Sequence, residues 1–135
     1  MMLRALRLLS LLAALLAVAT GARAAAVPSI LAAELEPGET GYGLTVLRGD
    51  SIVSFPVSYI GTLENAMVRQ DIVLIRVHGE PFDRTGIIAG MSGSPIFFRG
   101  RLLGALAYGW GFTKEPIAGV TPIGLMLDLI GEQEQ

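Results

Sequence analysis

Apolar and polar positions alternate in short runs along most of the chain after residue 26, and glycines separate these runs. Alternation with a period of two is typical of β-strands, because successive side chains of a strand point to opposite faces. Val, Ile, Phe and Tyr are common in the runs, which favours strands over helices. The pattern predicts strands at residues 42–47, 51–60, 71–77, 95–98, 101–108 and 117–120, whereas residues 63–70 fit either a loop or helical turns.

Turns and one helix complete the predicted layout. Arg48-Gly49-Asp50 and Arg99-Gly100 are expected at hairpin tips, since glycine permits the backbone conformations of tight turns. Thr121 is a good helix N-cap and Pro122 is tolerated at the first helical position, so we expect a helix to begin there. Gly131 is expected to end it in a left-handed turn. One face of this helix is apolar, with Ile123, Met126, Leu127 and Ile130.

The first 24 residues have the order of parts of a secretory signal peptide. Arg4 and Arg7 give a positive start, residues 8–19 are almost entirely apolar, and Ala22-Arg23-Ala24 places small residues at the two positions that a signal peptidase reads. The alternative is an uncleaved membrane anchor, but this apolar run is short for a span of about 20 residues. We therefore expect cleavage near Ala24, a mature domain without a stable membrane span, and export to the periplasm or the cell exterior.

Composition and charge exclude several classes of function. The chain carries ten basic and twelve acidic residues, and loss of residues 1–24 would remove three of the basic ones (Arg4, Arg7 and Arg23), leaving a net charge of −5. That balance argues against nucleic-acid partners, which need a basic surface. The absence of cysteine excludes thiol catalysis and cysteine-based zinc sites, and a single histidine argues against any other zinc site. We expect neither a metal nor a cofactor.

The segment Gly90-Met91-Ser92-Gly93-Ser94-Pro95 holds the main candidate for chemistry. A serine hydroxyl is a weak nucleophile until a base activates it and hydrogen-bond donors receive the oxyanion. Glycines flank Ser92 on both sides, and glycine adopts backbone conformations that side chains forbid. Such a turn can direct the backbone amides of Gly90 and Ser92 at one point, which is what an oxyanion hole requires. The nucleophile elbow of α/β-hydrolases fits poorly, because it needs a glycine where Ser94 stands.

The sequence around and after this segment extends the match to known enzymes. GMSGSPIFFRGRLLGALAYGWG resembles the serine turn and following hairpin of trypsin-like peptidases, and TGIIAGMSGSPI resembles the signature of the SpoIVB-type sporulation peptidase family. The resemblance covers residues 85–111 and, more faintly, 41–77 and 119–122. It implies that Ser92 is the nucleophile and that the substrate is a peptide or protein. The implied fold is mainly β, a trypsin-like half barrel or open barrel of about six strands with a short C-terminal helix.

The chain departs from the family at the catalytic base, which family members carry in a Gly-His motif that this sequence lacks. His78, the single histidine, lies 14 residues before Ser92 and is a candidate base that Glu80 or Asp83 would orient. The alternative, which we favour, is a half-solvated histidine at a strand end. Lys114 is a further candidate, but it lies in a polar loop where a lysine is usually solvated.

These observations predict an exported serine endopeptidase-like hydrolase domain of the SpoIVB type, spanning residues 25–135 and incomplete as it stands. A partner chain or further sequence would supply the missing catalytic residues. Two alternatives stay open. The domain could be a non-catalytic periplasmic or surface module that binds an extended peptide at a sheet edge, with Tyr108 and Trp110 in a cleft instead of a core. The chain could also be a fragment of a longer peptidase.

Overall fold

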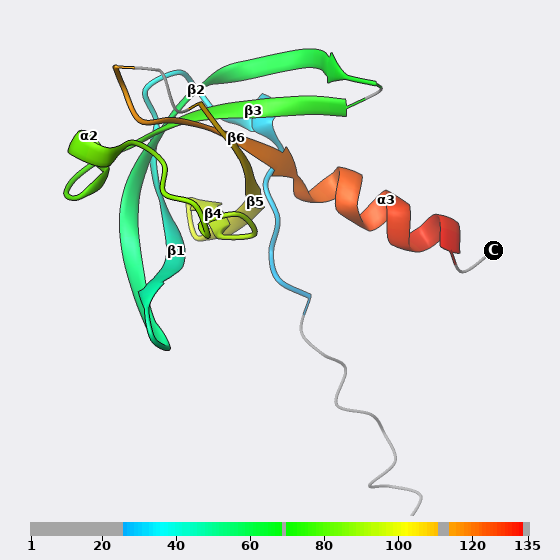
Figure 1. Ribbon diagram of the computed structural model, residues 1–135. Coiled ribbons are helices and arrows are strands. Elements are labelled where there is room, and N and C mark those ends of the chain that lie inside the picture. Colours follow the sequence, from blue (N-terminus) through cyan, green and yellow to red (C-terminus); the bar gives the residue numbers. More distant parts are fainter. Residues whose placement is uncertain (1–25, 69, 111–113, 134–135) are drawn as a thin grey trace, which may run out of the picture.

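The structure is a small barrel of antiparallel β-strands (Figure 1). This computed structural model describes residues 26–68, 70–110 and 114–133, so the expected signal peptide lies outside the described residues. The strands are β1 (Thr40–Arg48), β2 (Ser51–Met67), β3 (Gln70–Val77), β4 (Pro95–Phe98), β5 (Arg101–Gly109) and β6 (Ile117–Pro122). The helices are the short 3-10 helix η1 (Ala32–Glu34), α2 (Phe82–Thr85) and α3 (Ile123–Gln133). A mainly β domain with six strands and a C-terminal helix is confirmed.

The sheet closes on itself in the order β1-β2-β3-β6-β5-β4. The closing seam joins β1 to β4, where Tyr42 pairs with Phe97 and Gly43 with Ile96. Glycine makes this close approach possible, since a Cβ atom on Gly41 would lie only 2.3 Å from the carbonyl oxygen of Phe97. The barrel is therefore closed and not open at one side, and the edges of β1 and β4 protect each other.

Alternate side chains of the strands point inward and form one core. On β2, for example, Phe55 and Val57 are buried, whereas Ser54 and Pro56 are exposed. Each large apolar side chain buried in this way contributes about 1.5–3 kcal/mol to stability. The most deeply buried large side chains are Phe55, Phe98, Ile30, Ile75, Met91, Ile96, Leu103, Val57, Val73, Val77 and Val120. Because Met91 is one of them, the segment that carries Ser92 is anchored in the core.

The hairpin of β2 and β3 is longer than the sequence predicts. Residues 63–67, expected as a loop or helical turns, instead belong to β2, which continues to Met67, and β3 begins at Gln70. Pairing between the strands decides the conformation, with Leu63 opposite Ile72 and Met67 opposite Gln70. Both strands extend past the barrel as an arm (Figure 1). Local sequence could not reveal this, because strand preference depends on the partner strand.

The C-terminal helix begins and ends later than predicted. Thr121 and Pro122 do not open the helix but are the last residues of β6, where they pair with β5. These cross-strand contacts outweigh the capping preference of the two residues, and α3 begins at Ile123. The predicted end at Gly131 is also wrong, because α3 continues to Gln133. A glycine inside a helix costs only about 1 kcal/mol relative to alanine and does not by itself end the helix.

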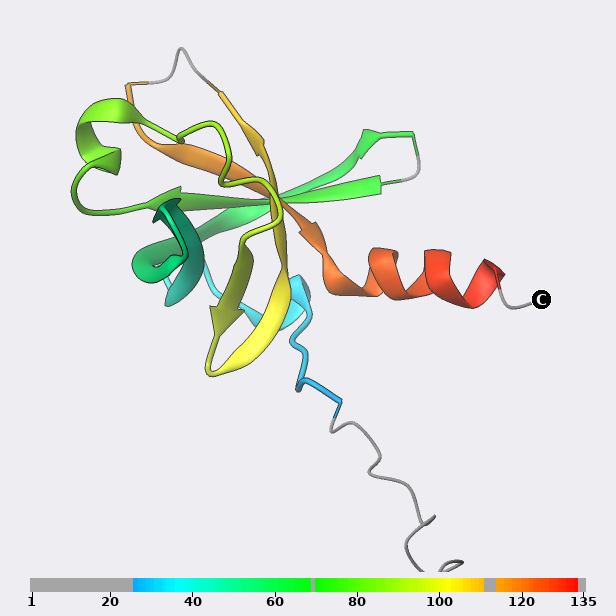
Figure 2. The same cartoon turned by 60° about the horizontal axis from the view of Figure 1, so that its bottom comes forward.

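Helix α3 projects away from the barrel (Figure 2). The predicted apolar face exists, but only its first part is covered: Ile123 and Met126 are half-buried, whereas Leu127 and Ile130 are exposed. Among the described helices, none combines the length and the apolar character needed to cross a membrane.

Ion pairs fix the segment before β1 to the β4–β5 hairpin. Arg99 Nε lies 2.8 Å from Glu39 Oε1, and Arg101 Nη2 lies 3.0 Å from Glu34 Oε2. Hydrogen bonding from Arg99 holds the pKa of Glu39 below its usual range. The pKa of Glu34 is lowered as well, first by the backbone amide of Leu31 and then by Arg101. Exposed pairs of this kind contribute little stability, so we regard them as fixing the position of the segment.

Candidate active site

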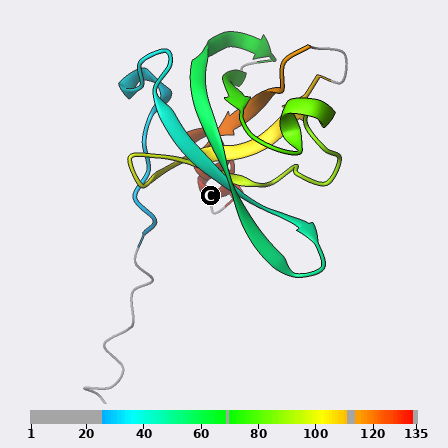
Figure 3. The same ribbon diagram turned by 90° about the vertical axis from the view of Figure 1, so that its left-hand side faces the viewer.

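Residues 86–94 connect α2 to β4 and carry the serine segment (Figure 3). The φ angles of Gly90 and Gly93 are +98° and +87°. These values lie in the left-handed region, which glycine adopts without steric cost. Between them the chain makes a tight turn, in which the Ser94 amide donates to the Met91 carbonyl at 3.0 Å. The two glycines thus reverse the chain on either side of Ser92.

The turn is also hydrogen-bonded to β5. The Gly93 amide donates to the Leu106 carbonyl at 2.7 Å, and the Leu106 amide donates to the Ser94 carbonyl at 2.9 Å. These two bonds continue the ladder of β4 and β5 one step beyond the pair of Pro95 with Ala105. The serine turn therefore lies where that ladder ends, and its backbone is held by the barrel wall.

Ser94, the second serine of the segment, points into the protein. Its hydroxyl donates to Thr45 Oγ1 on β1 at 2.9 Å. Ser94 and Thr45 are both buried, and they are the buried polar side chains of the part of the chain that the structure describes. A buried hydroxyl without a partner costs about 1–3 kcal/mol of stability. Each of these two hydroxyls supplies the hydrogen-bond partner that the other needs. The bond ties the serine turn to β1 in addition to β5.

Ser92 is exposed and lines an open groove of about 300 Å³. The other residues that line it come from residues 87–90 of the loop and 106–109 of β5: Ile87, Ile88, Ala89, Gly90, Leu106, Ala107, Tyr108 and Gly109. The volume is at the lower limit of ligand sites, which suits one or two side chains of a larger molecule.

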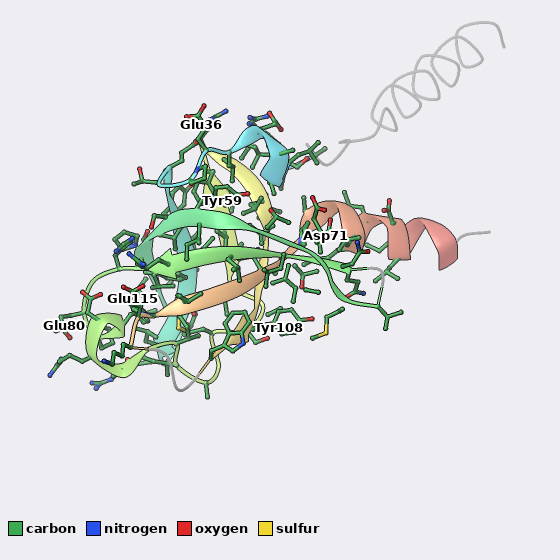
Figure 4. All side chains as sticks on the ribbon, turned by 90° about the horizontal axis from the view of Figure 1, so that it is seen from above. Glu36, Tyr59, Asp71, Glu80, Tyr108 and Glu115 are labelled. Atoms are coloured by element: carbon green, nitrogen blue, oxygen red, sulfur yellow. The ribbon has the colours of Figure 1, made fainter. Side chains whose placement is uncertain are left out.

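Tyr108, which lines the groove, lies well away from the carboxylates of Glu80 and Glu115 in the side-chain view (Figure 4). Neither acid lines the groove.

The backbone amides near Ser92 differ in whether they are already bonded. The Gly93 amide is engaged by the Leu106 carbonyl. The amides of Gly90 and Ser92, which are the predicted oxyanion donors, have no hydrogen-bond partner within the described residues. Both residues line the groove. Free donors beside a serine hydroxyl are suited to receive negative charge that develops on a carbonyl oxygen.

His78, the predicted candidate base, lies just after β3. Its Nε2 forms a hydrogen bond of 2.8 Å with the hydroxyl of Ser58 on β2. His78 does not line the groove. The two acids considered as its orienting partners are engaged elsewhere, because Glu80 forms an ion pair with Arg84 and Asp83 accepts a hydrogen bond from the Gly79 amide. Among the described residues, no hydrogen bond joins His78 to the predicted nucleophile.

The remaining candidates lie in different places. Lys114 is exposed and does not line the groove. Tyr108 lines the groove, whereas Trp110 is 42% exposed and does not. Within the described ranges, no group of three or more His, Cys, Asp or Glu residues could hold a metal ion.

Comparison with known proteins decides the family. The model of the SpoIVB peptidase S55 family matches residues 17–125, which is most of the chain. The chain belongs to this family. No curated protein and no solved structure matches it. For an S55 peptidase domain, a closed β-barrel with an exposed serine on a glycine-rich turn is consistent with serine peptidase chemistry.

Sequence reasoning missed Thr45 and the walls of the groove. A signal for Thr45 was present, because it shares the inward-facing row of its strand with Gly43, and a polar residue in such a row needs a partner. For the groove, Ile87 and Ile88 precede the serine turn directly and could have been noted as an apolar pair. The wall from β5 had no signal of its own, since only the barrel topology brings it beside the turn.

Proposed function

We propose that this S55 domain is the nucleophile-bearing domain of an exported serine endopeptidase, with Ser92 as nucleophile. The observation that carries the proposal is the combination, on one turn, of an exposed serine, a groove and two amides that have no partner among the described residues. In the reaction, Ser92 Oγ attacks the carbonyl carbon of a peptide bond while its proton passes to a base. The carbonyl oxygen becomes negative and receives hydrogen bonds from the Gly90 and Ser92 amides. An oxyanion donor of this kind contributes about 10²–10³-fold to rate.

We infer that the domain is catalytically incomplete without another chain or further sequence. The second half of the reaction needs a group that returns the proton to the leaving amine and later activates water. His78 is the only histidine in the chain, and its hydrogen bond to Ser58 directs it elsewhere. The open side of the groove leaves access for a base from outside.

A peptide substrate fits the position of the groove at the end of a strand ladder. Pairing of β4 with β5 ends at Ala105, with Leu106 bonded to the serine turn. On that side of β5, residues 107–109 have no strand partner among the described residues. An extended peptide can add to such an edge through backbone hydrogen bonds. Its carbonyl groups would then pass close to Ser92.

Active-site labelling tests the nucleophile. The purified chain is exposed to a fluorophosphonate probe and its intact mass is measured. Attack by Ser92 Oγ on phosphorus displaces fluoride, and the serine proton passes to solvent or buffer. With imidazole present as an external base, we expect a single adduct in the wild type and in Ser58→Ala, and none in Ser92→Ala. An adduct that persists in Ser92→Ala, or no adduct on folded protein, would contradict the proposal.

Export is proposed from residues 1–24, whose charged start, apolar run and small residues resemble a secretory signal peptide. We expect the protein recovered outside the cytoplasm to begin near Ala25, as N-terminal sequencing would show. Recovery of the uncleaved chain from the cytoplasm alone would contradict export.

A second candidate function is a non-catalytic module that binds an extended peptide. It is favoured by residues 107–109 of β5, which have no strand partner on the β4 side among the described residues and would hold a peptide without any base. The labelling experiment separates the two functions. Folded protein that binds peptides but never forms an adduct at Ser92 would support the binding module.

A further inference from the structure

The groove beside Ser92 is lined by uncharged side chains. Among the described residues these are the aliphatic Ile87, Ile88, Ala89, Leu106 and Ala107, together with Tyr108 and Ser92. Polar atoms still make up almost half of the lining, and hydroxyl and backbone groups supply them. No charged residue among the described ones lines the groove, although the chain as a whole carries 22 charged side chains. The described walls therefore offer a substrate side chain apolar contacts but no charged partner.

The lining determines which substrate side chain is favoured. An aliphatic side chain gains free energy in proportion to the apolar area it removes from water. A lysine or glutamate side chain would lose hydration of its charge and find no opposite charge on the groove walls. Discrimination against both charges is expected, since neither sign has a partner.

The two walls of the groove come into contact at one place. A Cβ atom placed on Gly109 would lie 3.1 Å from both Cβ and Cγ2 of Ile87. Ile87 also packs against the core, which holds its side chain in this position. The branched Ile87 side chain thus lies against the backbone of β5. This contact limits the room in a groove of about 300 Å³, which suits a short or branched aliphatic group better than a long straight chain.

We propose that this groove selects a substrate with an aliphatic side chain, of the size of valine or leucine, on the residue that precedes the cleaved bond. The assignment of that position rests on the proposed function, because it follows from where Ser92 and the free amides would hold the carbonyl group. The cleaved product keeps this residue at its C-terminus. Its carboxylate then lies at the Gly90 and Ser92 amides, with the side chain in the groove.

Product binding tests the proposal without requiring catalysis. Acetylated tetrapeptides that differ only in a C-terminal leucine, lysine, glutamate or glycine are titrated into the purified chain, and backbone amide shifts are followed by NMR. We expect the leucine peptide to bind about tenfold or more tightly than the other three. The largest shifts should fall on residues 87–90 and 106–109. Equal affinities for the four peptides, or shifts centred elsewhere, would overturn the proposal.

A charge placed on the wall sharpens the test. Ala107 is exposed and lines the groove, so Ala107→Glu adds a carboxylate there without disturbing the core. We expect the preference to move from the leucine peptide towards the lysine peptide by about tenfold. Ala66→Glu adds the same charge at an exposed alanine of β2 outside the groove and should leave the preference unchanged. An equal change in both variants would show a general charge effect and refute the groove.

A further variant keeps the outcome clear. Should Ala107→Glu not fold, Ile87→Ala shortens one wall, and the leucine peptide should lose about tenfold in affinity while the affinity of the lysine peptide stays unchanged. Retained peptide selectivity in a protein that forms no adduct would reject the peptidase function and keep the selectivity. Adduct formation at Ser92 without peptide selectivity would keep the peptidase function and reject the selectivity.

Discussion

Two serines of this barrel have complementary surroundings. Ser92 is exposed on a loop turn, beside free backbone amides and a groove, and no histidine is bonded to it within the described residues. Ser58 is part-buried on β2 and bonded to His78 Nε2 at 2.8 Å, but it does not line the groove. Acyl transfer needs a nucleophile, a base and donors for the oxyanion at one place. Within the described part of the chain, neither serine is found with all three.

The difference follows from how the barrel holds each residue. Ser58 faces Arg76 across the β2–β3 ladder, and His78 lies two residues after Arg76, so the contact of Ser58 with His78 is fixed by strand register. Ser92 lies outside any ladder, on a turn that glycines with positive φ shape. A regular strand sets a pair of side chains in place. Directing two backbone amides at one point requires an irregular turn.

The largest effect is expected from Gly90→Ala, which changes the turn but not Ser58. Gly90 has a φ of +98°, and Gly100 at the β4–β5 tip has +70°, while a Cβ atom on either would meet no atom within 4 Å. Both alanine variants therefore carry backbone strain alone. We expect Gly90→Ala to slow labelling of Ser92 by about 10²-fold, because an oxyanion donor is misplaced. Gly100→Ala is the control, and equal slowing in both would refute the role of Gly90.

Next in size is the effect of Thr45→Val, which removes the partner of the buried Ser94 hydroxyl. We expect a loss of about 1–3 kcal/mol in the free energy of unfolding, measured by denaturant titration. Thr45→Ser keeps the hydroxyl and should lose less. The double variant Thr45→Val with Ser94→Ala should lose less than the sum of the two single variants, since no hydroxyl is left unpaired. Additive losses would mean that the two hydroxyls do not depend on each other.

A smaller effect is expected from His78→Ala, which tests the separation of the two serines directly. A catalytic base contributes about 10²–10⁴-fold to rate, so its removal would be obvious. We expect labelling of Ser92 to change by no more than about twofold, and stability to fall by about 1 kcal/mol through the lost bond to Ser58. Strong slowing in a folded His78→Ala variant would instead make His78 the base.

The smallest effect is expected from Arg99→Ala. Arg99 bonds to Glu39 and lies neither at the serine turn nor at the pair of Ser58 and His78. Hydrogen bonding from Arg99 lowers the pKa of Glu39 in the folded state. The stability from this pair is therefore present above the pKa of an unfolded glutamate and is lost as the pH falls through the lower folded-state pKa. We expect Arg99→Ala to show a slightly shallower loss of stability in acid, followed by thermal unfolding from pH 3 to 7. Ser92 labelling should not change.

Much of the barrel was predictable from local sequence. Alternation in 71–77 and the glycines at Gly49 and Gly100 gave strands and hairpin tips that the structure confirms. The sequence misplaced the elements whose conformation depends on a partner strand: residues 63–67 belong to β2 in the β2–β3 arm, and Thr121 belongs to β6. Propensity acts within a segment, whereas strand pairing acts between segments far apart in sequence.

The candidate site likewise has features that local sequence predicts and features that only strand pairing creates. The glycines around Ser92 indicated the turn, because their use is local. The partner of His78 could not be predicted, since Ser58 lies 20 residues earlier and comes close only through strand register. The Thr45–Ser94 bond spans 49 residues and the groove joins two elements, so both depend on barrel closure.

We propose that Ser92 has its oxyanion donors but lacks its base. The rate of fluorophosphonate labelling at Ser92 is measured in increasing concentrations of imidazole, with the modified residue located by peptide mass mapping. Added imidazole can take the serine proton in place of the missing group. We expect a rate at Ser92 that rises with the concentration of neutral imidazole. A rate that stays constant, or an adduct that maps to Ser58, would show that Ser92 is not a nucleophile waiting for a base.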